Sequence, residues 1–282
     1  MKIINAFGLA VVVSLTCTAQ QREKRRFGPP TVWGPVRTLL VEQAQIIDPN
    51  GELSEGPRIL LQTIEYNEDG TRKEVNWYAP EGTISRKTIE IYDPDGRLLE
   101  ARHFSGDGTS QGRMVSLYDS SKRLTEQTIY RSNGSIANKI TFAYQNNQRT
   151  HESVSYDQNG AVLGRITGTL DLKTHVMEAV RQTPNQIEKR QSSFTDIPEG
   201  QVFQEKVNDN LTQRSLSRPL GPGRVEWIEY NPDGTVKSQQ RFESQLDSHG
   251  NLVKRVRFIK DKSGDFHPVE VLYWTIEYYG KS

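Results

Sequence analysis

The sequence predicts an all-β fold, a long curled antiparallel β-meander built from 26-residue repeats of two strands and two turns. Three observations predict it. Eight turns lie alternately 12 and 14 residues apart, each has an aromatic residue four positions earlier, and the segments between them have the length of strands. The turns are centred on Gly70, Gly82, Gly96, Gly108, Lys122, Gly134, Gln148 and Gly160. Such a period indicates a repeat architecture, in which each unit buries its face against its neighbours.

The turns contain the residues that tight hairpins need. In the turn from Asp93 to Gly96, the Asp side chain can bond to nearby backbone, Pro94 presets φ, and the glycine takes a positive φ at little cost. This pattern predicts a type I turn followed by a glycine bulge. The turns therefore set the strand boundaries throughout the repeat.

The aromatic residues before the turns form two rows. Successive strands run antiparallel, so turns one full repeat apart lie on the same edge of the sheet. One row is Tyr66, Tyr92, Tyr118 and Tyr144, and the other is Tyr78, Phe104, Tyr130 and Tyr156. These eight are the candidate binding residues, because aromatic rings stack on sugars or anchor protein partners. Burial of each repeat's own face explains the same period, and we favour that structural role.

The N-terminal 19 residues have the pattern of a secretory signal peptide. Lys2 precedes an apolar run from Ile3 to Leu15, and the small-residue sequence from Cys17 to Ala19 follows. The run is shorter than the ~20 apolar residues of a spanning helix, so we expect no transmembrane segment after signal removal. We expect an exported protein, periplasmic or extracellular. A lipid anchor on Cys17, the only cysteine, is the less favoured alternative.

Composition divides the rest of the chain into four parts. We expect a flexible leader at 20–35, a β-repeat region at 36–204, a loop or hinge at 205–223, and C-terminal repeats with a capping strand at 224–282. The repeat restarts at 228–235, which matches 64–71 at seven of eight positions. The final strand, from Val271 to Tyr279, is expected to close or cap the sheet. We expect the sheet to have open edges, where self-association is a risk.

Several turns resemble the YD repeat of bacterial RHS-type proteins. The sequence from Tyr92 to Leu98 carries the resemblance, with weaker copies at 118–124 and 156–162, and 247–252 has the same core. The resemblance covers roughly residues 60–165 and 225–255. Large RHS proteins wrap their strands into a shell around cargo, but this chain is too short for such a shell and its turns are more closely spaced. The resemblance therefore implies a β-repeat fold and, for small exported proteins, an interaction module.

Composition and motifs exclude several functions. The 36 basic and 35 acidic residues are spread through the chain, so nucleic acid is not an expected partner. No two of the five histidines lie within four residues of each other, and there is no G-x-S-x-G motif. Asp93 and Asp95 offer calcium only two of the six to eight oxygens it needs. We expect no catalytic residues, no cofactor and no metal.

The expected function is that of an exported, non-enzymatic binding or scaffold protein at the cell envelope, whose sheet engages an envelope protein or a glycan. Two alternatives stay open. One is a hydrolase acting on envelope polymers, with a site near His103 and His151. The other is an immunity or antitoxin-like protein that binds one toxin tightly.

The turn assignment predicts that Gly96→Val lowers the melting temperature more than Lys122→Val does. Only the first change removes a residue that takes positive φ at little cost. Thermal unfolding of the two variants beside the parent chain measures the difference. Equal melting temperatures would contradict the turn assignment.

Overall fold

The computed structural model describes residues 32–48, 52–145, 150–171 and 175–280, which form strands and turns only. The expected signal peptide, Cys17 and most of the expected leader lie outside the described residues. The strands are β1 (Val36–Ile47), β2 (Ser54–Glu55), β3 (Ile59–Tyr66), β4 (Arg72–Tyr78), β5 (Ile84–Tyr92), β6 (Leu98–Ser105), β7 (Ser110–Tyr118), β8 (Leu124–Tyr130), β9 (Ile136–Gln145), β10 (Thr150–Tyr156), β11 (Val162–Asp171), β12 (Val176–Thr183), β13 (Gln186–Ile197), β14 (Gly200–Val207), β15 (Asn210–Gly221), β16 (Arg224–Tyr230), β17 (Val236–Leu246), β18 (Leu252–Lys260) and β19 (Phe266–Tyr278). The predicted all-β class is confirmed.

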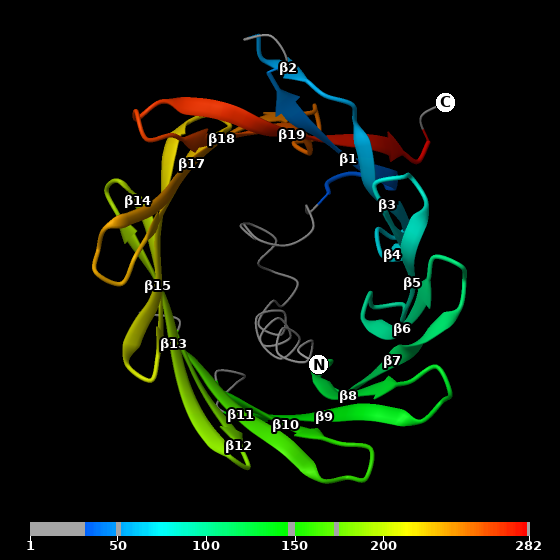
Figure 1. The fold of residues 1–282 in the computed structure, drawn as a ribbon. Coiled ribbons are helices and arrows are strands. Elements are labelled where there is room, and N and C mark those ends of the chain that lie inside the picture. The colour runs from blue at the N-terminus through cyan, green and yellow to red at the C-terminus, as the bar shows by residue number, and fades with distance from the viewer. Residues whose placement is uncertain (1–31, 49–51, 146–149, 172–174, 281–282) are drawn as a thin grey trace.

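The strands form an antiparallel meander that closes into an 18-strand barrel (Figure 1). From β3 to β19, each strand pairs with the next one in sequence. β1 pairs with β3 on one side and with β19 on the other, which closes the ring. β2 adds only a two-residue pairing to the end of β1. The prediction that the last strand closes the sheet is confirmed.

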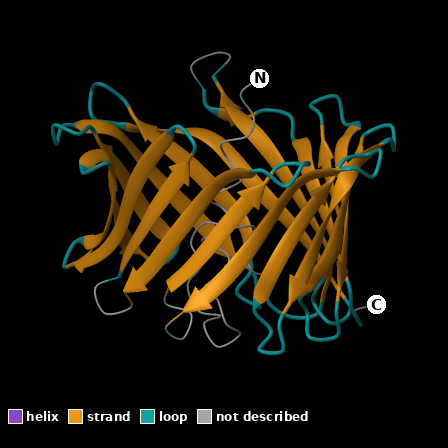
Figure 2. Cartoon of the chain, turned by 90° about the horizontal axis from the view of Figure 1, so that it is seen from below, coloured by secondary structure: helices purple, strands orange, loops and turns teal. Residues whose placement is uncertain are grey.

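The expectation of open sheet edges is wrong. A strand edge has unpaired backbone groups, but here the first and last long strands satisfy each other's groups along nine paired positions, from Val36 with Tyr278 to Gln45 with Glu270. The strands tilt strongly relative to the barrel axis (Figure 2), as closure of a sheet requires. The curl that the sequence predicts therefore continues until the two ends meet.

The inner and outer faces of the wall follow from β2. Figure 1 shows β2 outside the ring, and its Glu55 accepts hydrogen bonds from Lys254 and Tyr273. These two side chains therefore face outward. Successive side chains alternate between the faces, so the neighbouring Trp274 faces inward. Directly paired residues lie on the same face, so the pairing assigns a face to the residues of each strand in turn. The assignment made from strand to strand around the barrel agrees with that of β19 when it reaches this strand again.

The predicted turn geometry is present. In the turn after β5, the Gly96 amide donates to the Asp93 carbonyl and the Asp93 amide donates to the Arg97 carbonyl, at 2.9 and 3.0 Å. Gly96 has a φ of 76° and Lys122, at the same place in a later turn, has a φ of 65°. A residue with a side chain is strained at positive φ, so Lys122 already has this strain in the parent chain. A substitution of Gly96 would introduce the same strain there.

Residues 205–223 do not form the expected loop or hinge. They complete β14 and form β15, and each strand pairs along its length with its neighbours. The turn-forming residues that suggested one loop instead make two tight turns. Asn208 and Asp209 take positive φ in the first turn, and Gly221 and Gly223 do so in the second. The sheet is continuous across this segment.

The C-terminal copy of the repeat lies at the opposite end of the barrel from the segment that it matches. Tyr230 ends β16 and Tyr66 ends β3, and β16 is the thirteenth strand after β3. Because this number is odd, β16 runs opposite to β3 and its turn belongs to the other rim. Tyr230 consequently faces outward, whereas Tyr66 faces inward.

Apolar side chains gather on the inner face beside the closure. Leu39, Ile64, Val75 and Trp274, from β1, β3, β4 and β19, form a buried cluster against which Val32 also packs. Burial of such side chains contributes about 1.5–3 kcal/mol each. The cluster therefore strengthens the wall where its first and last strands meet.

A polar latch joins the N-terminal end of the described chain to the same closure. The Asn251 side chain accepts a hydrogen bond from the Trp33 amide and donates to the Trp33 carbonyl, at 2.5 and 2.9 Å. It also donates to the Tyr278 hydroxyl, which donates to Asp247. Asn251 is only 1% exposed. The latch thus holds residues from both ends of the described chain and the turn after β17.

Asn251→Ala should destabilise the barrel by about 1–3 kcal/mol, because it removes the hydrogen bonds that the buried Asn251 side chain makes to the Trp33 backbone and to Tyr278. Thr235→Ala is the matched control, since Thr235 follows the turn glycine after β16 as Asn251 follows Gly250. Urea unfolding measures both variants. Equal losses would show that Asn251 serves only its own turn.

Candidate functional site

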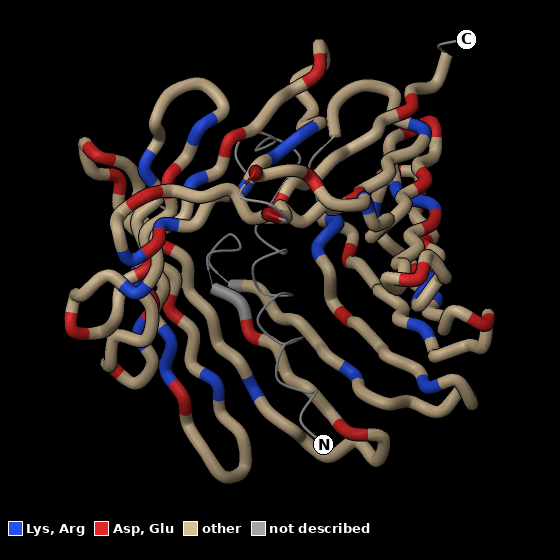
Figure 3. The backbone as a smooth tube through the Cα atoms, turned by 45° about the horizontal axis from the view of Figure 1, so that its top comes forward, with Lys and Arg blue, Asp and Glu red and all other residues tan. Residues whose placement is uncertain are grey.

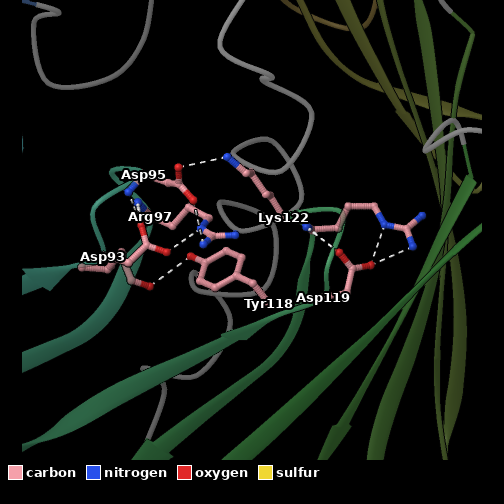
Figure 4. Close-up of polar contacts among 8 residues, drawn as sticks. Asp93, Asp95, Arg97, Tyr118, Asp119 and Lys122 are labelled. Carbon is pink, nitrogen blue, oxygen red and sulfur yellow. Dashed lines mark hydrogen bonds and ion pairs between the residues drawn. The ribbon is translucent and has the colours of Figure 1, made fainter.

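The turns after β3, β5 and β7 lie at the same end of the barrel, which we call the first rim. Each of these turns is built around an aspartate or an asparagine. Asp93 Oδ1 accepts hydrogen bonds from the amides of Asp95 and Arg97 at 3.0 and 2.9 Å, and Oδ2 pairs with the Arg97 side chain (Figure 4). Asp119 bonds Arg123 in the same way. Backbone and guanidinium bonds hold the pKa of Asp119 below its usual range. The Tyr-Asp sequence therefore has a structural role in the turn.

The first aromatic row lies at the first rim and faces inward. It consists of Tyr66, Tyr92, Tyr118 and Tyr144. The Tyr118 hydroxyl donates to the Leu98 carbonyl at 3.0 Å, and Tyr144 donates to the Leu124 carbonyl at 2.8 Å. Burial raises the pKa of all four phenols, that of Tyr144 to about 12. The two hydroxyls thus tie neighbouring strands together on the inner wall.

The second aromatic row lies at the other rim and faces outward. It consists of Tyr78, Phe104, Tyr130 and Tyr156, at the ends of β4, β6, β8 and β10. The two rows therefore share neither a rim nor a face of the wall. Only the second row can meet a partner that approaches from outside the barrel.

Each of three aromatic residues in the second row lies directly opposite a cation on the preceding strand. The cross-strand pairs are Lys87 with Phe104, Arg113 with Tyr130, and Lys139 with Tyr156. The Arg113 guanidinium lies 4.7 Å from the centre of the Tyr130 ring. Side chains in such pairs are close enough to act together.

The same three cations also form ion pairs with glutamates one strand further back. Glu74 pairs with Lys87 at 3.0 Å, Glu100 with Arg113 at 3.3 Å, and Glu126 with Lys139 at 2.6 Å. Glutamate, cation and aromatic residue thus form a trio that occurs three times between β4 and β10. We call these nine residues the outer strip. Charged residues also follow the strands around the rest of the barrel (Figure 3).

Sequence reasoning found the aromatic members of the outer strip and missed the charged ones. The signal was present in the chain, because glutamate recurs every 26 residues at five positions and a cation recurs every 26 residues at four positions. They are Glu74, Glu100, Glu126, Glu152 and Glu178, and Lys87, Arg113, Lys139 and Arg165. A search at the repeat period for residues other than aromatics and glycines would have found them.

The outer wall is hollowed on both sides of Phe104. One hollow of about 240 Å³ lies between β6, β7 and the turn after β8, and is lined by Phe104, Arg102, Arg113 and Arg131 with small residues between them. The other, of about 420 Å³, lies between β5 and β6 beside Ile84. Phe104 therefore separates two open hollows of the outer wall.

The two histidines of the alternative hydrolase site do not come together. His103, in β6, faces inward with Nδ1 3.1 Å from the Thr88 hydroxyl, and burial lowers its pKa. The His151 backbone lies in β10, four strands away, or roughly 19 Å. Among the described residues, no group of three or more His, Cys, Asp and Glu side chains is placed to hold a metal ion.

Comparison with known proteins yields only distant structural similarity. No family model matches the chain, and no curated protein is similar to it. A porin-like protein from Bacteroides uniformis is 14% identical over 88% of this chain and 99% of its own, with a TM-score of 0.39. The TcdB2-TccC3 structure is 9% identical over 84% of this chain, with a TM-score of 0.25, and this chain spans 18% of its length. The described part of the chain contains no helix able to cross a membrane.

The inner tyrosines predict a loss of stability at high pH. An unfolded phenol has a pKa near 10, whereas that of folded Tyr144 is raised to about 12. Between these values the unfolded chain binds fewer protons, so stability is complete below pH ~10 and falls as the pH rises toward 12. Urea unfolding at pH 9 and 11 should show the loss. Tyr144→Phe should lose less than the parent chain, and an identical loss would contradict this assignment.

Proposed function

We propose that this chain is an exported, non-enzymatic β-repeat barrel that binds a partner at the cell envelope, and that the outer strip is the binding surface. The N-terminal signal pattern supports export. The repeated trio carries the proposal, because it places an aromatic ring beside a cation three times on one exposed side of the wall. A few residues supply most of the energy at protein interfaces, and tyrosine and arginine are enriched among them.

Stability alone explains the repeated trio poorly. The cations of its ion pairs are 35–47% exposed and the glutamates 16–24%, and ion pairs that stay open to water contribute about 0–1 kcal/mol, so the barrel gains little from each of them. The glutamate nevertheless recurs in five copies, while the residue that follows it varies between Val75, Ala101, Gln127, Ser153 and Ala179. If the outer surface contacts a partner, this contact explains why the glutamate is the same in each copy of the repeat while the residue after it differs.

The position of the ion pairs also supports a wall that faces water. Glu100 and Arg113 lie within strands on the outer face, and so do Glu126 and Lys139. A lipid-facing barrel has an apolar outer band, in which a central arginine or lysine costs about 2–4 kcal/mol. We therefore propose a barrel that acts in the aqueous part of the envelope or outside the cell.

The turn chemistry supports a relation to YD-repeat proteins. The Asp157 and Asp247 carboxylates accept hydrogen bonds from two turn amides each, as Asp93 does. We propose that the turns built around these aspartates, which occur at both rims, are short YD-type turns. This relation concerns the repeat, and it leaves the partner to be identified from the outer strip.

The proposal predicts that the outer strip captures an envelope component. The full exported chain, immobilised, should retain a saturable component of its own host's solubilised envelope, with protein and glycan measured separately. The variant Phe104→Ala/Tyr130→Ala should bind that component at least tenfold more weakly, since removing one such anchor costs about 2 kcal/mol or more.

A matched control makes the test specific. The variant Ile187→Ala/Val236→Ala removes two side chains that are 59% and 55% exposed and lie far from the strip along the wall. It should retain the component as the parent chain does, and circular dichroism should show that both variants fold. Equal retention by the two variants would contradict the assigned surface. Release of envelope fragments by the purified chain would favour the hydrolase instead.

A further inference from the structure

The smaller hollow beside Phe104 is a concave part of the outer strip. Phe104 forms one side of it, Arg102 and Arg113 come from β6 and β7, and Arg131 comes from the turn after β8. Between them lie only serines and glycines, including Ser110 and Gly112. The hollow therefore combines one apolar ring with three guanidinium groups and has no bulky side chain between them.

The hollow has a surplus of positive charge. Glu100 accepts hydrogen bonds from both Arg102 and Arg113, at 3.0 and 3.3 Å, so one carboxylate balances two cations. Arg131 donates to the Ile136 carbonyl and the Gln158 side-chain oxygen, at 2.6 and 3.1 Å, and both acceptors are neutral. Three cations against one carboxylate leave two positive charges.

Neighbouring contacts hold the arginines in place. Arg113 lies over the Tyr130 ring, and Arg131 is fixed by its two bonds to the next strand and the next turn of that rim. A guanidinium that is already positioned loses little freedom when it binds an anion, and its planar fork fits carboxylate and phosphate oxygens. The hollow is therefore suited to an anion attached to a ring-sized group.

We propose that this hollow binds an acidic sugar residue of an envelope glycan, with its ring against Phe104 and its carboxylate or phosphate on Arg113 and Arg131. The inference rests on the proposed function and names the class of its partner. The Phe104 ring supplies a flat apolar surface for the C–H face of a sugar. The second hollow, across Phe104, gives room for the adjoining residue of a polymer.

The closed wall favours a glycan over an extended peptide. Peptides commonly bind sheet proteins by adding a strand to a free edge. Among the described residues the barrel wall has no such edge, because β1 pairs on both sides. A repeating polymer also matches a surface on which the aromatic and the cation recur at Tyr130 with Arg113 and at Tyr156 with Lys139.

Binding of defined oligosaccharides to the full exported chain tests the proposal. Titration calorimetry compares oligogalacturonate, which carries a carboxylate on every ring, with its methyl ester, which has the same rings and no charge. We expect saturable binding of the acid, at least tenfold weaker binding of the ester, and weaker binding at high salt. Equal binding of acid and ester, or binding of neither, would overturn the proposal.

Two arginine variants separate this hollow from general surface charge. Arg131→Gln should weaken oligogalacturonate binding at least tenfold. Arg224→Gln removes an exposed arginine from β16, nine strands from β7 on each side of the ring, and should leave binding unchanged. Similar affinities of the two variants would overturn the assignment to this hollow.

Two further probes identify other occupants. Poly-glutamate that binds more tightly than oligogalacturonate would overturn the sugar in favour of an acidic protein. Inorganic phosphate that competes fully at equal concentration would show an ion site without a role for Phe104. The chain could retain an envelope protein through the outer strip and yet not bind the acidic sugar. That result would contradict this inference and would still support the proposed function. Loss of both would sink both.

Discussion

The pairing of β1 with both β3 and β19 closes the sheet into a barrel and fixes the position of every other strand. A sheet that curls without closing leaves unpaired backbone groups along two edges. Here the two ends satisfy each other, and the buried Leu39 and Trp274 pack against each other's strands at the junction. Asn251 adds bonds to Trp33 and Tyr278 beside them. The closure thus combines backbone, apolar and polar interactions in one place.

The alternation of 12 and 14 residues supplies the stagger that closure needs. Glu65 and Ile89 both pair with Glu74, so they lie level on either side of β4. Tyr66 is one residue beyond Glu65, whereas Tyr92 is three residues beyond Ile89. Each pair of strands therefore advances by two residues, the difference between 14 and 12. Barrels require such a stagger, and it tilts the strands.

The wall separates two roles that the sequence presents as one pattern. At the first rim, Tyr118 and Tyr144 turn inward and bond to carbonyls of the wall. At the other rim, Phe104 and Tyr130 turn outward beside cations. The same period thus produces ties between strands on one face and exposed rings on the other. This separation directs the proposed binding to the outer strip and to the charge surplus around Arg131.

The strand class, the turn positions and the turn chemistry can be read from the amino-acid sequence, because these depend on residues within one hairpin. Gly96 and Asp93 act over four residues, so their roles can be read locally. The tertiary structure decided the closure, which joins residues more than two hundred positions apart, and the strand count that placed Tyr230 at the opposite rim from Tyr66. It also decided which row faces outward and that Glu100, Arg113 and Tyr130 meet. Those contacts depend on register between strands, which no single turn specifies.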